Sequence, residues 1–376
     1  MTAGRRLRLA VLVNLVPRKL GSLEGWLVGV AREARARDHT LDVFTYGPAH
    51  ASFLAALEQA GGVWEPLEPV LRQPLGGVRR LRRYDVIQLN LFGARSGAAL
   101  IAYAAWPAQV LFIERTSAPA TTRPSPAGRA KLWLLNRLTV PRISSLAGVS
   151  DYARDRTGRQ LGLDPRRTVT IYNGVDLDRF RWVPRPAGAT ARPTILVVAH
   201  LIPEKGVDVL LRAFALLEDP EARLIVVGDG PEQAGLRALA ASLGIDARTE
   251  FAGLRDDVPS CLQTAEVFVH PAVWAEAFGW TIAEAMASGC VVVASRTGGI
   301  PELVEDGQTG LLVEPHDPKA IAAALNRVLA SPDLRRRLAA AARRRVEERF
   351  SLQRCAAQHV DWCERAARAG STRRSR

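Results

Sequence analysis

The sequence predicts an α/β protein built from two doubly wound parallel-sheet domains. Short runs rich in Val, Ile and Leu alternate with segments of helical periodicity, as expected for parallel strands covered by helices on both faces. This alternation of strand-like and helix-like segments is interrupted once, by a stretch rich in Pro, Gly and small residues (180–193), and then resumes. The length of 376 residues also exceeds that of one ordinary core.

The first domain is expected over residues 1–181. Its first strand candidate, 7–16, is followed by a helical pattern over 23–38 and by a second strand at 41–46. The remaining strand candidates of this domain are 84–92, 108–114, 143–150 and 167–175. A C-terminal helix over 351–370 is expected to return to this domain.

Residues 182–192 have the composition of a linker, and the second domain is expected over 193–350. Apolar runs and helical segments alternate in it as before. The strand candidates are 193–201, 222–230, 249–254, 265–272, 290–295 and 310–315, and the helix candidates are 207–217, 232–243, 281–288, 318–330 and 333–350.

The net charge of +13 is confined to the first half of the chain. Residues 1–187 hold 28 Lys and Arg against 14 Asp and Glu, whereas residues 188–376 hold 23 against 24. Three interpretations stay open: a solvated basic face, an anionic membrane surface or lipid phosphate, and nucleic acid. Trp133, Leu134, Leu135 and Leu138 are interleaved with Arg and Lys, which favours the membrane. No recognition-helix, zinc-finger or RNA-binding signature supports nucleic acid.

The four cysteines form no C-x-x-C pair, and Asn14 interrupts the first apolar run, so that the N-terminus does not have a signal-peptide pattern. We therefore expect free thiols and a cytoplasmic protein, with peripheral attachment to the inner face of the plasma membrane if the basic half binds lipid. The apolar stretch 97–113 is split by Pro107 and Gln109 and is too short to cross a bilayer.

Three strand ends of the second domain carry polar residues, and ligands bind at this edge of open parallel sheets. Lys205 follows the first strand, a Gly-Asp-Gly turn follows the second, and Glu276 and Glu284 flank a predicted helix start after a third. A lysine and helix N-termini suit a diphosphate, and carboxylates accept hydrogen bonds from sugar hydroxyls. This combination predicts a nucleotide-sugar site.

The sequence resembles the retaining glycosyltransferases of family 4, which have two facing Rossmann-like domains in the arrangement called GT-B. The resemblance covers most of the chain. The motifs that carry it are, in order, GSLE (21–24), VSDYARD (149–155), TIYNGVDLDRF (170–180), LIPEKG (201–206), VVGDGPE (226–232), EAFGWTIAEAMASG (276–289), ASRTGGIPELVEDGQTGLLVEP (294–315) and RFS (349–351).

The resemblance implies a role for individual residues. Lys205 and Glu276 are the catalytic candidates: Lys205 would contact the donor diphosphate, and Glu276 would hold the hydroxyls of the transferred sugar. Glu284 would bind the ribose. The donor-binding set implied in full is Gly21, Ser22, His200, Lys205, Gly228, Leu254, Phe278, Gly279, Trp280, Thr281 and Glu284. The acceptor-side candidates are Glu114, Arg115 and Asn90.

Two departures from the family pattern stand out. His200 occupies a position where the family usually has Arg, and a histidine is a weaker and only partly charged anion ligand. Glu114 stands where many members have a histidine, and Gln88 and Asn90 also replace common histidines.

The function implied is a retaining, metal-independent hexosyltransferase without a cofactor. It would move a sugar from a nucleoside diphosphate sugar to a saccharide or lipid-linked acceptor in bacterial cell-surface polysaccharide or glycolipid biosynthesis. The alternatives are a catalytically impaired nucleotide-sugar binding relative and a nucleotide-sugar 2-epimerase on the same fold. Asp176 and Asp178 form a D-x-D that we interpret as turn chemistry, and the six histidines have no metal-ligand spacing.

Overall fold

A computed structural model describes residues 5–116, 125–182 and 192–372, with side chains of residues 126–132 and 371–372 left undescribed. The expected linker (182–192) therefore lies almost wholly outside the described residues. The chain divides into unit 1, Met1–Gly174 with Leu352–Arg376, and unit 2, Val175–Ser351. The division falls at Gly174, seven residues before the expected boundary at 181.

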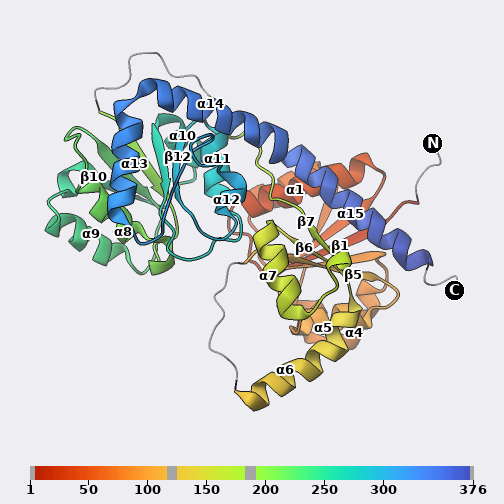
Figure 1. Cartoon of the computed structure of the whole chain (residues 1–376). Helices are drawn as coiled ribbons and strands as arrows, with labels where there is room; N and C mark the ends of the chain where they lie inside the picture. Colours follow the sequence, from red (N-terminus) through yellow and green to blue (C-terminus); the bar gives the residue numbers. More distant parts are fainter. Residues whose placement is uncertain (1–4, 117–124, 183–191, 373–376) are drawn as a thin grey trace. The chain divides into compact units, whose positions relative to one another are not determined.

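Unit 1 contains a seven-stranded parallel sheet in the order β3-β2-β1-β4-β5-β6-β7 (Figure 1). Strand order reverses at β1, which pairs with β2 on one side and β4 on the other. The strands are β1 (Arg8–Val13), β2 (Thr40–Thr45), β3 (Gly62–Pro66), β4 (Val86–Asn90), β5 (Gln109–Glu114), β6 (Ile143–Gly148) and β7 (Thr168–Thr170).

Helices cover both faces of this sheet, as the continuous apolar strands require. They are α1 (Ser22–Ala36), α2 (Ala51–Gln59), α3 (Glu68–Arg72), α4 (Pro74–Leu81), α5 (Gly97–Ala104), α6 (Pro126–Thr139), α7 (Asp151–Leu161) and α15 (Leu352–Thr372), with 3-10 turns η1 (Val140–Arg142) and η2 (Pro165–Arg167). α15 packs along α1 and over β4 and β5. A Cβ on Gly29 of α1 would lie 2.7 Å from Leu352 Cδ1, so the close approach of the two helices requires glycine there.

Unit 2 contains a six-stranded parallel sheet in the order β10-β9-β8-β11-β12-β13. The strands are β8 (Thr194–Val198), β9 (Arg223–Val227), β10 (Thr249–Gly253), β11 (Val267–His270), β12 (Val291–Ser295) and β13 (Leu311–Val313). The helices are α8 (Val207–Phe214), α9 (Gln233–Ser242), α10 (Val258–Thr264), α11 (Trp280–Ala287), α12 (Ile300–Leu303), α13 (Pro318–Ala330) and α14 (Pro332–Arg349), with η3 (Pro203–Lys205) and η4 (Asp246–Arg248).

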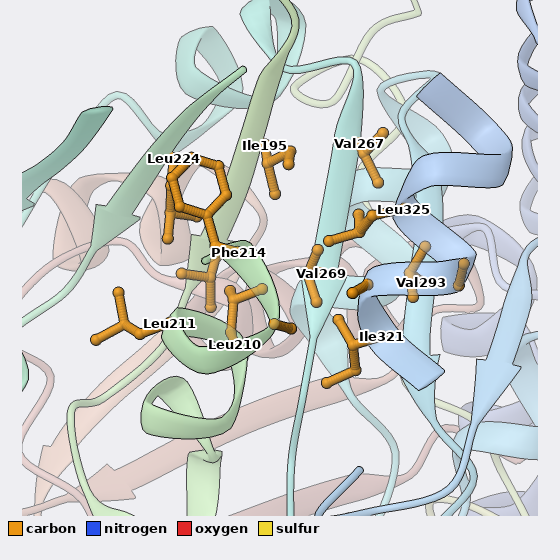
Figure 2. Close-up of a cluster of buried hydrophobic side chains, with 14 of the residues drawn as sticks. Ile195, Leu210, Leu211, Phe214, Leu224, Val267, Val269, Val293, Ile321 and Leu325 are labelled. Atoms are coloured by element: carbon orange, nitrogen blue, oxygen red, sulfur yellow. The ribbon is translucent and has the colours of Figure 1, made fainter. Parts of the chain in front are cut away.

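The core of unit 2 lies between its sheet and the helices α8 and α13. Figure 2 shows Phe214 of α8 and Leu325 of α13 pointing toward the central strands, where Val269 and Val293 are fully buried. This packing fixes the strands, so that the loops at their carboxyl ends are held in place for a site.

The described part of the chain contains no helix that is both long and apolar enough to cross a bilayer.

Candidate functional site

Lys205, Glu276 and His270 meet at the carboxyl edge of the sheet of unit 2. The ammonium of Lys205 contacts Oε1 of Glu276, and Nε2 of His270 lies 3.4 Å from the same oxygen. His270 ends β11 and is 4% exposed, and its Nε2 has no well-formed hydrogen bond to any residue that the structure describes. A carboxylate, an ammonium group and an imidazole thus lie together at the strand edge.

Backbone contacts explain why residues 71 positions apart meet. Gly206 adopts φ +63° directly after Lys205, and a Cβ there would lie 2.1 Å from the carbonyl oxygen of Pro271. The amide of Val273 also donates to the carbonyl of Glu204 at 3.0 Å. The turn η3 is therefore fixed against the loop after β11, which carries Glu276.

Burial alone would raise the pKa of Glu276. The contact with His270 and the positive charge of Lys205 outweigh this effect and lower the pKa to about 2. The side chain of Glu276 is only 12% exposed, so little water screens these charges. Glu276 is therefore an ionised hydrogen-bond acceptor at neutral pH, which suits the hydroxyls of a sugar.

The helix that follows begins at Trp280, so Glu284 lies one turn inside α11 and Glu276 lies in the preceding loop, as expected from the sequence. Gly279 caps the helix with φ +93°, a backbone conformation that strongly favours glycine. Glu284 is 4% exposed. The first turn of α11, with Thr281, presents backbone N–H groups at the same sheet edge.

Phe278 belongs to the core of unit 2. Its ring packs edge-to-face on Phe350 with centroids 5.9 Å apart, and the residue is 2% exposed. Only its backbone can therefore face a ligand, and the predicted contact of Phe278 with the donor stays a prediction.

His200 follows β8 and is exposed. Its Nδ1 donates to the carbonyl of Asp229 at 2.7 Å, and the amide of Leu201 donates to the same oxygen at 2.9 Å. The neutral ring therefore has a bare Nε2, and only the protonated ring has a second N–H for an anion. Gly228 follows the neighbouring strand β9 and has φ +132°. Leu254 is 72% exposed in the loop after β10.

Unit 1 contributes a second set of candidate residues. Gly21 caps α1 and Ser22 begins it, and the amide of Gly21 donates to Oε2 of Glu24 at 3.2 Å. The predicted approach of Gly21 and Ser22 to the donor diphosphate stays a prediction.

The acceptor-side candidates form a tightly packed group in unit 1. Arg115 donates from Nε to Oδ1 of Asn90 at 3.0 Å and from Nη1 to Oδ1 of Asn173, and its guanidinium lies 3.9 Å from the ring centre of Trp26. Burial lowers the pKa of Arg115 to about 9. Glu114 accepts from the amide of Thr116 at 2.8 Å. The structure thus brings Asn90 and Arg115 together, and their role toward an acceptor stays a prediction.

The contacts of Glu276 with Lys205 and His270 are not apparent from the sequence, which places Lys205 on the diphosphate and Glu276 on the sugar. His270 had a weak signal in its position at a strand end, before Pro271.

The D-x-D motif forms a turn, as predicted. Oδ1 of Asp176 accepts from the amides of Asp178 and Arg179 at 3.0 and 3.1 Å. No group of three His, Cys, Asp or Glu side chains arranged for a metal occurs among the residues that the structure describes.

Solved structures with the same architecture establish the fold class. Anabaena HepE in complex with UDP superposes with a TM-score of 0.79 at 24% identity, covering 94% of this chain and 99% of that one. Sucrose-phosphate synthase from Thermosynechococcus elongatus superposes with a TM-score of 0.74 at 22% identity, covering 97% and 100%. The protein therefore has two Rossmann-like domains of the GT-B type.

The family follows from sequence matches. The family model described as Glycosyltransferase Family 4 matches residues 24–179, and the model described as Glycosyl transferases group 1 matches residues 178–345. The chain belongs to glycosyltransferase family 4.

Two curated relatives differ in how much of their length is matched. D-inositol 3-phosphate glycosyltransferase of Streptomyces scabiei is 37% identical over 209 residues, which cover 50% of this chain and 47% of the relative. The GDP-mannose-dependent alpha-(1-6)-phosphatidylinositol monomannoside mannosyltransferase of Mycobacterium tuberculosis is 28% identical over 388 residues, covering 94% and 97%. With the first of these, and with others of the same name, the match spans only about half of the relative's length.

Proposed function

We propose that this protein transfers a hexose-type sugar from a nucleoside diphosphate sugar to a saccharide or lipid-linked acceptor, with retention of the anomeric configuration and without a metal or cofactor. The single observation that carries the proposal is the contact of Lys205 with Glu276 just before the N-terminus of α11, with Glu284 in the first turns of that helix. Membership of the family supports a transferase.

The pairing of Lys205 with Glu276 suggests how a donor would bind. The diphosphate carries more negative charge than one carboxylate, so it would draw the ammonium of Lys205 away from Glu276. Glu276 would then be available to the hydroxyls of the sugar, and the first turn of α11 would face the phosphates. As the bond to the diphosphate breaks, Lys205 would stabilise the charge of the leaving group.

The acceptor class in this proposal follows the names of the relatives. One is named for D-inositol 3-phosphate and another for a phosphatidylinositol mannoside, and both acceptors are phosphorylated polyols. A role in bacterial cell-surface polysaccharide or glycolipid biosynthesis fits such acceptors. The protein would work in the cytoplasm, at the inner face of the plasma membrane.

Attachment to that membrane is part of the proposal. The last part of α6 exposes Trp133, Leu134 and Leu138, with exposed fractions of 60%, 55% and 65%. Arg137 lies on the same face, 5.1 Å from the ring centre of Trp133. Exposed Trp and Leu beside arginine are typical of a helix that binds at an anionic lipid interface. The side chains of Arg129 and Lys131 lie outside the described residues.

The experiment that tests the site is thermal stabilisation against a panel of nucleoside diphosphates and nucleotide sugars. A ligand at 100 times its Kd stabilises by about 2.7 kcal/mol. We expect one nucleotide class to stabilise the wild type, and Lys205→Ala and Glu284→Ala to abolish the shift. Transfer activity of Lys205→Ala should fall by on the order of 3–4 kcal/mol of transition-state stabilisation.

The same panel separates the alternatives. Activity of Lys205→Ala equal to that of wild type would contradict the role of Lys205. Nucleotide-sugar binding without turnover for any acceptor would indicate the impaired relative, and interconversion of the donor sugar at C2 would indicate the epimerase. The alternative of a catalytically impaired relative rests on His200, whose neutral ring has no second N–H for a diphosphate.

A further inference from the structure

The backbone of Glu276 is fixed by the loop after β12, whereas its carboxylate is oriented by two side chains. The amide of Gly299 donates to the carbonyl of Glu276 at 2.8 Å, and a Cβ on Gly298 would lie 2.1 Å from the same oxygen. Lys205 and His270 both contact Oε1 of the carboxylate. The direction of this carboxylate therefore depends on these two residues.

The two partners of the carboxylate differ in how firmly they are held. Lys205 has a long, flexible side chain that is 27% exposed. The side chain of His270 is only 5% exposed, and its ring stacks on Phe268 with centroids 6.4 Å apart. His270 is also the last residue of β11, a central strand of the sheet. It is therefore a rigid partner of Glu276, and Lys205 is a movable one.

The neighbours of His270 determine which of its nitrogens carries a proton. Glu276 is ionised, and an ionised carboxylate only accepts hydrogen bonds, so the nitrogen that faces it, Nε2, is protonated. Nδ1 lies 3.5 Å from Oγ1 of Thr281, and in the neutral ring it accepts from that hydroxyl. Thr281 belongs to the first turn of α11, so His270 connects the start of this helix with Glu276.

The contact between His270 and Glu276 has room to shorten. Nε2 lies 3.4 Å from Oε1, whereas a charge-assisted N–H···O bond is about 2.7–2.9 Å long. Lys205 contacts the same oxygen, and the donor diphosphate draws it away in the mechanism proposed above. The ring can then close on the carboxylate, since hydrogen bonds in active sites often tighten only in the complex. The buried Nε2, which has no well-formed hydrogen bond to the described residues, would gain one in this step.

We propose that His270 is a positioning residue for the donor sugar: it holds the carboxylate of Glu276 toward the sugar hydroxyls while Lys205 is engaged by the diphosphate. His270 acts through Glu276 and does not itself contact the sugar. Thr281 keeps the protonated nitrogen of the ring directed at Glu276. This inference rests on the transferase function proposed above and assigns a further residue to its donor site.

A double-mutant cycle of His270→Leu and Glu276→Gln tests whether His270 acts through Glu276. Leucine removes the N–H group but still fills most of the buried site. The probes are UDP-glucose and GDP-mannose, which represent the two nucleotide classes named above. Calorimetry at pH 7.5 measures their affinity for the wild type, both single variants and the double variant.

We expect His270→Leu to weaken donor binding about tenfold or more, because a hydrogen bond to a charged group is lost. The same change should have no further effect when Glu276 is already Gln. His270→Gln, whose side-chain amide can donate at nearly the same place, should recover most of the lost affinity. A residue that only supports packing would give losses that multiply in the double variant, and Gln would not restore binding.

Val269→Ala is the matched control for loss of stability. Val269 precedes His270 in β11, is 1% exposed and belongs to the core of unit 2 (Figure 2). Successive side chains of a strand point to opposite faces, so this variant should have a lower unfolding midpoint but wild-type donor affinity. If His270→Leu does not fold, His270→Asn, which is polar but too short to reach Glu276, takes its place in the cycle.

Two results would overturn the role of His270 alone: donor affinity of His270→Leu equal to that of wild type, or losses that multiply in the double variant. Binding to the wild type that is lost in Lys205→Ala would then leave the transferase function standing. No binding of either nucleotide sugar to the wild type would contradict the transferase function itself, and the role of His270 with it.

Discussion

At the scale of single residues, Lys205 and Glu276 form an ion pair, which a donor diphosphate opens in the mechanism that we propose. Such a pair keeps both side chains at the strand edge and keeps Glu276 ionised, with His270 contributing to its low pKa. In the proposed mechanism the diphosphate replaces Glu276 as the anionic partner of Lys205, so that the ammonium group would keep a partner when the donor binds.

His200 yields the sharpest prediction at this scale. Its Nδ1 is already used by the carbonyl of Asp229, so the neutral ring offers no donor to a phosphate. We expect His200→Arg to bind nucleoside diphosphates about tenfold more tightly at pH 8, because arginine stays charged and bidentate. Calorimetry with the nucleotide found in the stabilisation panel measures the change.

His316→Arg, an exposed change elsewhere in unit 2, serves as the control for added charge. Equal affinity of wild type and His200→Arg at pH 8 would show that position 200 does not contact the diphosphate.

At the scale of elements, α6 tests the membrane interpretation. We expect the wild type to sediment with vesicles that contain anionic lipid, less so as salt rises, and not with neutral vesicles. Replacing Trp133, Leu134 and Leu138 by Gln should weaken binding about tenfold or more, because three apolar side chains no longer enter the interface.

These three residues are exposed, so the replacements should leave the unfolding midpoint unchanged. The control Leu216→Gln changes a leucine of unit 2 that is 51% exposed, and it should bind vesicles as the wild type does. Absence of sedimentation with anionic vesicles at low salt would contradict the membrane interpretation.

The long apolar strands and the helix that begins at Trp280 were predictable from the sequence. Short edge strands, and contacts between residues far apart in the sequence, were not. β4 and β11 are buried along their length and show continuous apolar or near-apolar runs. β3 is a short edge strand ending in Glu65 and Pro66, and no apolar run indicates it. The helix start at Trp280 follows from its glycine, but the position of His270 beside Glu276 depends on how two loops pack.

At the scale of the whole molecule, α15 completes the core of unit 1 and places His359 inside it. His359 is 1% exposed, its Nε2 lies 2.7 Å from Nε2 of Gln88, and its ring packs edge-to-face on Trp26 at 4.7 Å. Burial, and then the charge of Arg115, lower the pKa of His359 to about 3.

The low pKa of His359 predicts a loss of stability in mild acid. Below the ordinary pKa of about 6.5 the unfolded chain binds a proton that the folded chain does not, so the free energy of unfolding falls as pH drops from 6.5 toward 3. The slope should reach about 1.4 kcal/mol per pH unit. Urea unfolding at pH 7.5, 5.5 and 4.5 measures it.

In His359→Gln this component of the slope should vanish, although the variant can be less stable at every pH because of altered packing. His316→Asn, an exposed histidine of unit 2, should leave the slope as in the wild type. Parallel stability profiles for wild type and His359→Gln would mean that His359 is not held neutral in the folded protein.

The path of the chain also sets an order of events on the ribosome. Unit 2 occupies Val175–Ser351, between the first part of unit 1 and the helix that covers α1. During synthesis the sheet of unit 1 emerges first, but α15, with His359 and Trp362, emerges only after all of unit 2. Unit 2 can therefore finish folding while the apolar face of unit 1 is still uncovered. The nascent chain should be most open to ribosome-bound chaperones during that interval, although the strands of unit 1 are translated before unit 2.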